Sequence, residues 1–221
     1  MDLEKQELLK TILVWLVPCL PAITIHEIAH GWGALLLGDP TAKDAKRLSL
    51  NPFRHIDLFG TIIVPWVLML AHAPFLFGWA KPVPVDFSRL KKGRLGVFLV
   101  AMAGPLSNFL MMMGWLAIGN AAGILDQTPR LLDAAEPSLA SQIVLIGIVI
   151  NFALLFYNLI PLPPLDGGRI LSALLPEKAS RAFMRIERYG IPLLLLLVAT
   201  GLLNFLLEPL VRFFFSLMKL A

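Results

Sequence analysis

Two histidines and a glutamate stand at a spacing that suits metal chemistry: His26, Glu27 and His30. Residues four positions apart on an α-helix are separated by about 400°, so both imidazoles project from one face, one turn apart. That geometry suits two ligands of one cation. Glu27, about 100° round the same turn, can reach a water molecule on that cation, which is the place of the general base in an H-E-x-x-H arrangement. The pattern therefore predicts a metal site with two histidine ligands and a glutamate base.

The helix that must carry this motif lies in a strongly apolar chain. The 221 residues are 57% hydrophobic and only 15% charged, with a mean hydropathy of +0.77. Such a composition is outside the range of ordinary soluble domains, so we expect a polytopic membrane protein. Ionisable groups within apolar spans are costly and point to function. The first apolar run is too long for the core of a cleavable signal peptide, so we expect it to remain as an anchor.

The single cysteine and the distribution of charge limit which metal ligands and which partners the chain can use. Cys19 alone can form neither an intrachain disulfide nor a multi-cysteine zinc cluster, so a metal must be held by histidine and carboxylate. Cys19 itself is expected to be a small, buried, apolar side chain. The net charge of +4 collects in loops between apolar runs, as membrane topology requires, and no nucleic-acid-binding module is recognisable.

Apolar segments of spanning length predict an all-α fold with about four to six transmembrane helices. They cover about residues 8–37, 58–78, 96–121, 140–162 and 190–207, with an apolar tail after the break expected at Glu208 and Pro209. The tail, 208–221, is either transmembrane or interfacial. We expect one integral-membrane domain over residues 1–221, with a core at about 8–170 and C-terminal helices at about 190–221.

The charges of the loops predict how these segments cross the membrane. Loops 38–57, 79–94 and 163–188 are basic, whereas loop 122–139 is acidic. The positive-inside rule places the three basic loops on the cytoplasmic side. Segment 58–78 would then begin and end on one side, which predicts a re-entrant element that dips into the membrane and returns. A full span is the alternative, because the segment is long enough.

Segment 58–78 and the residues after it contain helix-breaking residues, a possible metal ligand and a possible edge strand. Pro65, Pro74 and Gly78 supply the breaks that a re-entrant element needs, provided that protein surrounds the freed backbone groups. His72 is a possible third metal ligand, although its place among turn residues favours an interfacial histidine. After it, valines alternate with prolines over residues 81–86, which indicates either an edge strand that can pair with an extended peptide or a stiff connector.

Two later stretches bring polar groups to helix-breaking positions. Asn108 follows a Gly-Pro pair and carries an amide into an apolar region, where it can join helices or contact a substrate. Asp166 follows three prolines in four positions and precedes two glycines, so it lies on an unwound stretch near the cytoplasmic boundary. Asp166 is a candidate third ligand, because two histidines, a carboxylate and a water form a common catalytic zinc set. A surface residue or a helix cap is the alternative.

Three motifs in order resemble the site-2 protease family of intramembrane zinc metalloproteases, peptidase family M50. They are H-E-x-x-H at residues 26–30, G-P-x-x-N at residues 104–108 and N-x-x-P-x-x-x-L-D-G at residues 158–167. The resemblance covers about residues 8–170. It implies a three-helix catalytic core, with a re-entrant or short β-strand element between the first two core helices.

The resemblance also implies the roles of the site residues. One Zn²⁺ ion is expected on His26, His30 and Asp166, with Glu27 as the catalytic base. Asn158, and less directly Asn108, are expected to contact the substrate backbone near the scissile bond. Many members carry a regulatory domain such as PDZ or CBS; this chain shows none, so gating by such a domain is not carried over.

The expected activity is regulated intramembrane proteolysis: hydrolysis of peptide bonds within or near transmembrane segments of membrane-protein substrates. The expected location is the cell membrane, with multiple passes through the lipid bilayer and the active site nearer the cytoplasmic side. A metal transporter or sensor that uses the same histidines and carboxylates is the alternative. The substrate, the need for a prior cleavage and the oligomeric state are left open.

Overall fold

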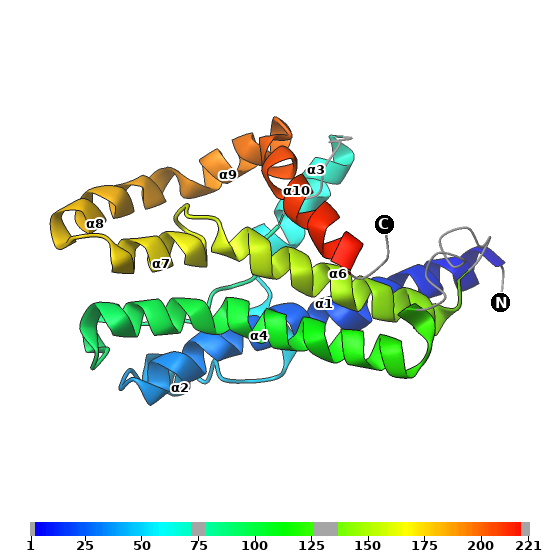
Figure 1. Cartoon of the computed structure of the whole chain (residues 1–221), viewed down its shortest axis with the longest axis horizontal. Helices are drawn as coiled ribbons and strands as arrows, with labels where there is room; N and C mark the ends of the chain where they lie inside the picture. Colours follow the sequence, from blue (N-terminus) through cyan, green and yellow to red (C-terminus); the bar gives the residue numbers. More distant parts are fainter. Residues whose placement is uncertain (1–2, 72–77, 126–136, 218–221) are drawn as a thin grey trace.

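Three long helices form the centre of the molecule in the computed structural model, which describes residues 3–71, 78–125 and 137–217 (Figure 1). They are α1 (Leu3–Leu36), α4 (Gly93–Ala121) and α6 (Leu139–Leu159). Each is long and apolar enough to cross a membrane. The three pack against one another pairwise, and α4 runs opposite to α1 and α6. The end of α1, the start of α4 and the end of α6 therefore lie toward one end of the bundle.

Shorter elements surround this bundle. Between α1 and α4 lie α2 (Thr41–Asp44), η1 (Pro52–His55), the π-helix η2 (Leu58–Ile63), α3 (Val64–Leu70) and η3 (Phe87–Arg89). After α6 come α7 (Asp166–Leu174), α8 (Glu177–Met184), η4 (Arg185–Tyr189), α9 (Gly190–Ala199) and α10 (Leu202–Leu217). Helix α7 turns back from α6 and packs against α4. All regular structure among the described residues is therefore helical, as predicted.

Small residues allow the long helices to approach closely. Gly33 of α1 faces Ala103 of α4, where an added Cβ would lie 3.4 Å from the alanine Cβ. Gly147 of α6 receives the Trp115 ring, which an added Cβ would approach to 2.4 Å. An apolar cluster of Met112, Ile124, Val144, Ile148 and Phe152 is buried beside this contact. Close van der Waals packing of this kind is what holds helices together in lipid, where water supplies no hydrophobic driving force.

Helix α1 continues without interruption through Pro18 and Pro21. Pro18 is fully buried, so its ring packs inside the bundle. Cys19 is half-buried, rather than buried as expected.

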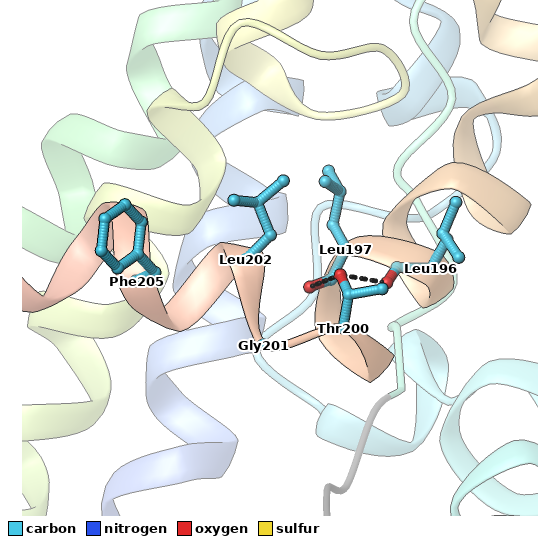
Figure 2. A pocket seen from close by; sticks show the side chains of 6 residues that line it. All are labelled: Leu196, Leu197, Thr200, Gly201, Leu202 and Phe205. Atoms are coloured by element: carbon cyan, nitrogen blue, oxygen red, sulfur yellow. Dashed lines mark hydrogen bonds between the residues drawn. The ribbon is translucent and has the colours of Figure 1, made fainter.

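The C-terminal apolar segment differs from the expected single helix over 190–207. It is divided into α9 and α10 at Gly201, which has a φ of +72°. The Thr200 hydroxyl donates to the carbonyl of Leu196 at 2.8 Å, in the last turn of α9 just before this glycine (Figure 2). A left-handed backbone is accessible to glycine at little cost, so the chain turns there. The expected break at Glu208 and Pro209 is wrong, because α10 runs through both residues.

The segment expected to dip into the membrane is helical over Leu58–Leu70, which is shorter than the three candidate spans. Residues 72–77, including His72, lie outside the described residues. Trp79 returns to the start of this segment, because its N–H donates to the Gly60 carbonyl at 3.1 Å. The re-entrant path stays a prediction. Residues 81–86 form no assigned strand in the described structure, so pairing with a peptide also stays a prediction.

Candidate metal centre

Three potential ligand atoms meet between α1 and the start of α7. The Nε2 atoms of His26 and His30 are 3.2 Å apart, and each lies 3.2 Å from Oδ2 of Asp166. His26 is buried, and the other two side chains are nearly so. The structure thus brings together one helical turn and a carboxylate from a distant part of the chain. These three residues form a candidate metal site among the described residues.

The other nitrogen of each imidazole is held by the protein. His26 Nδ1 lies 2.6 Å from Oδ1 of Asn108, and His30 Nδ1 lies 2.8 Å from the Val100 carbonyl oxygen. A carbonyl oxygen only accepts hydrogen bonds, so both Nδ1 atoms carry the proton. In the neutral imidazole the lone pair is then on Nε2, the atom that faces Asp166. Ligands of a metal are commonly oriented in this way by a hydrogen bond to the second ring nitrogen.

This donor set fits a divalent cation. Two imidazole lone pairs and a carboxylate oxygen converge in a nearly dry site, and Oδ2 of Asp166 is buried without a hydrogen-bond partner among the described residues. Without a cation or a shared proton, that arrangement of acceptors is electrostatically unfavourable. Two histidines and a carboxylate, with one position left for water, are the ligands of many catalytic zinc sites.

Gly104 of α4 lies directly against the imidazoles of His26 and His30, where there is no room for a side chain. A Cβ there would lie 2.3 Å from Nε2 of His30 and 2.6 Å from Cε1 of His26. Both contacts are shorter than van der Waals distances, so only glycine lets α4 pass so close to the imidazoles. Helix α4 continues through Gly104 and Pro105, and the glycine provides the space for the imidazoles there.

Asp166 is placed by the turn between α6 and α7. It is the first residue of α7, which follows the turn at residues 160–165. Gly167 lies against the carbonyls that end α6, where a Cβ would meet the Leu159 and Ile160 oxygens at 2.3 Å. Gly168 packs equally closely against the backbone of Pro163. The two glycines therefore allow the start of α7 to fold tightly onto the end of α6.

Glu27 is bound to the segment that precedes η3. Its Oε2 accepts a hydrogen bond from the Val83 N–H at 2.8 Å. The same segment is tied at its far end, where the Asp86 N–H donates to Oδ2 of Asp39 at 2.7 Å. The candidate base is therefore held from outside its own helix, a contact that the motif spacing does not reveal.

Asp39, just beyond α1, is fully buried and anchors this segment. Burial raises the pKa of Asp39, but hydrogen bonds from the Thr41 hydroxyl, the Thr41 N–H and the Asp86 N–H bring it below its ordinary value of 3.8. Asp39 therefore stays ionised in the folded protein over the neutral range. The sequence did not predict a structural role for Asp39, because an aspartate after a glycine in a loop fits no recognisable motif.

The two asparagines expected near the substrate lie in different surroundings. Asn108 is fully buried behind His26, and it hydrogen-bonds Ala22 and Asn151 as well as the imidazole. This geometry favours orientation of His26 over direct contact with a substrate. Asn158 is half-buried, and its Nδ2 donates to the Leu154 carbonyl at 2.9 Å. Its side-chain oxygen has no hydrogen-bond partner within the described part of the chain.

Comparison with known proteins gives consistent matches. The model of peptidase family M50 matches residues 120–199, which include Asn158 and Asp166. The chain is 39% identical over 194 residues to "Putative zinc metalloprotease YwhC" of Bacillus subtilis (strain 168), covering 86% of this chain and 82% of that protein. It is 27% identical to Rip2 of Mycolicibacterium smegmatis, which carries the same description, over 89% of this chain and 71% of that protein. No solved structure matches the chain.

Proposed function

Because this chain belongs to peptidase family M50, the site-2 protease family, we propose that it is a zinc endopeptidase that cleaves other membrane proteins within or near their spanning segments. The observation that carries the proposal is the meeting of two imidazole Nε2 atoms and the Asp166 carboxylate at 3.2 Å, next to Glu27. Three helices of spanning length around this cluster support a reaction that takes place at membrane depth.

His26, His30 and Asp166 would hold the zinc ion. A zinc ion held there would supply a Lewis acid for a bound water molecule and for the scissile carbonyl. Glu27 would take the proton from the attacking water and later donate it to the leaving amine. The hydrogen bond from Val83 holds one oxygen of this carboxylate, so the side chain of the proposed base is tethered to a segment outside α1. The buried walls restrict bulk water, which strengthens each electrostatic contact.

A helical substrate hides its carbonyls in its own hydrogen bonds, so it must unwind locally before cleavage. Asn158, at the end of α6 and close in sequence to Asp166, is suited to bind one of the freed backbone groups. Its side-chain oxygen can accept an N–H of the unwound substrate, because its Nδ2 is already engaged with Leu154. Cleavage of a membrane substrate by Asn158→Ala at the wild-type rate would exclude this role.

The active site is proposed to open toward the cytoplasm. His30 lies in the second half of α1 and Gly104 in the first half of α4, so the cluster is nearer the end of the bundle where the basic loops begin. Positively charged loops remain on the cytoplasmic side of bacterial and other cell membranes. Water for hydrolysis would therefore enter from that side.

Glu27→Gln tests the proposal, because it keeps the size of the side chain and removes the base. The full chain in proteoliposomes is mixed with single-span model peptides, and the products are identified by mass spectrometry. Cleavage should fall about 10²- to 10⁴-fold while bound zinc is retained. Glu7→Gln, at the exposed start of the same helix, is the matched control and should cleave normally. Transport of zinc without proteolysis by the wild type would support the transporter alternative.

A further inference from the structure

A row of buried amides connects the candidate metal centre to α6. Asn108 Nδ2 donates to Oδ1 of Asn151 at 3.0 Å, and Asn151 Nδ2 donates to the Gly147 carbonyl at 2.8 Å. Both asparagines are fully buried. The row therefore runs from His26 of α1 through Asn108 of α4 to Asn151 of α6, and it crosses all three core helices.

The direction of every hydrogen bond in this row is determined by backbone carbonyls. The Gly147 carbonyl only accepts, so Asn151 must present its Nδ2 there and its Oδ1 to Asn108. The Ala22 carbonyl likewise requires Nδ2 of Asn108, at 3.2 Å. Both hydrogens of that amide are then used, and only Oδ1 is left for His26. A flipped Asn108 would place two donors against each other at Nδ1 of the histidine.

The two histidines differ in how firmly they are held. His30 is oriented by the Val100 carbonyl, which belongs to the backbone of α4 and cannot rotate. His26 is oriented by a carboxamide on a side chain, which can rotate unless something fixes it. In a dry membrane interior no water can hydrogen-bond an unpaired amide. The partner that hydrogen-bonds the Asn108 carboxamide therefore strongly affects its orientation.

We propose that Asn151 is a positioning residue of the metal centre: by fixing the Asn108 carboxamide, it holds His26 with Nε2 toward Asp166 and so strengthens binding of the cation. This inference rests on the proposed function, because it takes His26, His30 and Asp166 to be the ligands. Among the described residues, the Asn151 side chain hydrogen-bonds Asn108 and the Gly147 carbonyl, so it acts on His26 through Asn108.

The test measures zinc affinity of the purified full chain by competition with a chromogenic chelator. Asn151→Leu keeps the approximate volume and removes the acceptor, and zinc affinity should fall about 10-fold, as for loss of other supporting hydrogen bonds. The visible spectrum of the Co²⁺-loaded protein should change as well, because it reports ligand geometry. Ile148→Ala is the matched control: Ile148 is equally buried in α6 but outside the row, so zinc affinity and spectrum should stay at wild-type values.

A double-mutant cycle separates positioning from general packing. Asn108→Ala alone should weaken zinc binding by about 10- to 100-fold. If Asn151 acts only through Asn108, adding Asn151→Leu to that variant should change the zinc affinity by less than about 2-fold. Losses that simply add, or an Asn151→Leu protein with wild-type zinc affinity, would overturn the inference.

A second variant covers the case in which Asn151→Leu does not fold. In Asn151→Ser the hydroxyl can still donate to the carbonyl four residues earlier, but it is too short to reach Asn108. It should therefore weaken zinc binding to a similar degree, and wild-type affinity would contradict the inference. Failure of the proposed function has a different outcome: the wild type and His26→Ala would then show the same zinc content.

Discussion

Val83 donates its backbone N–H to Oε2 of Glu27 at 2.8 Å, although 56 positions separate the two residues. Val83 lies between Pro82 and Pro84, which have no N–H, so it carries the only backbone donor of these three residues. The segment is also held before and after this point, by Lys81 N–H to the His55 carbonyl and by Asp86 N–H to Asp39. The position of the proposed base thus depends on a loop outside its own helix.

Val83→Pro should reduce the turnover number, because it removes the donor that holds Glu27. A misplaced catalytic group costs about 10- to 100-fold in rate even when all ligands remain. We expect kcat to fall by that amount with zinc content unchanged, measured on a model membrane peptide and by metal analysis. Val85→Pro is the matched control, since the Val85 N–H makes no hydrogen bond among the described residues. Equal effects of the two prolines would contradict a role for the Val83 contact.

Gly104→Ala should abolish zinc binding, because the new methyl group would stand 2.3 Å from Nε2 of His30. Gly114→Ala provides the comparison within α4, since nothing lies within 4 Å of its added Cβ. Alanine favours a helix over glycine by about 0.5–1 kcal/mol, so the Gly114 variant should be as stable as wild type or slightly more so. Metal content and thermal unfolding check both outcomes. Normal zinc content in Gly104→Ala would mean that the histidines are not the ligands.

Asp166→Asn should lower zinc affinity by more than about 100-fold, beyond the effect of losing a supporting hydrogen bond. The amide keeps the size of the side chain but removes the negative charge that faces the two Nε2 atoms. Asp57→Asn is a suitable control, because the Asp57 carboxylate caps η2 and does not approach the cluster. Chelator competition measures both, and comparable zinc affinities for the two variants would refute Asp166 as a ligand.

Asp39→Asn should destabilise the protein by about 1–3 kcal/mol at neutral pH, because its amide nitrogen would face the Asp86 N–H in place of a carboxylate oxygen. The pKa of Asp39 lies below 3.8 in the folded state, so its stabilising contribution is present above that pH and is lost as the pH falls through the lower folded value. The difference between wild type and variant should therefore shrink below about pH 4. Thermal unfolding in detergent at several pH values measures it.

The exposed Asp44 of α2 supplies the control for this prediction. Asp44→Asn should unfold like the wild type at every pH, because the residue is exposed and surface carboxylates contribute little. A pH-independent difference between Asp39→Asn and wild type would show that the buried carboxylate is not the cause.

Local spacing predicted what depends on helix geometry alone. His26 and His30 lie on one face because residues four apart always do, and α1, α4 and α6 are visible in the sequence as long apolar runs. The position of Asp166 could not be derived in this way. It was inferred from the order of three motifs, and the structure shows the turn that brings it to the histidines. Zinc binding itself stays a prediction.

Other features required the packed structure. The partners of Asn108 and Asn151 come from different helices, and no periodicity in one helix reveals which buried amide meets another. The space that Gly104 leaves for two imidazoles is equally a property of two helices in contact. The chain alone thus determined the types of the candidate ligands, their helical face and the apolar, membrane-like composition, since these follow from local geometry and residue content. Tertiary packing decided which groups orient the two histidines and hold Glu27, because those contacts join residues that are distant in sequence.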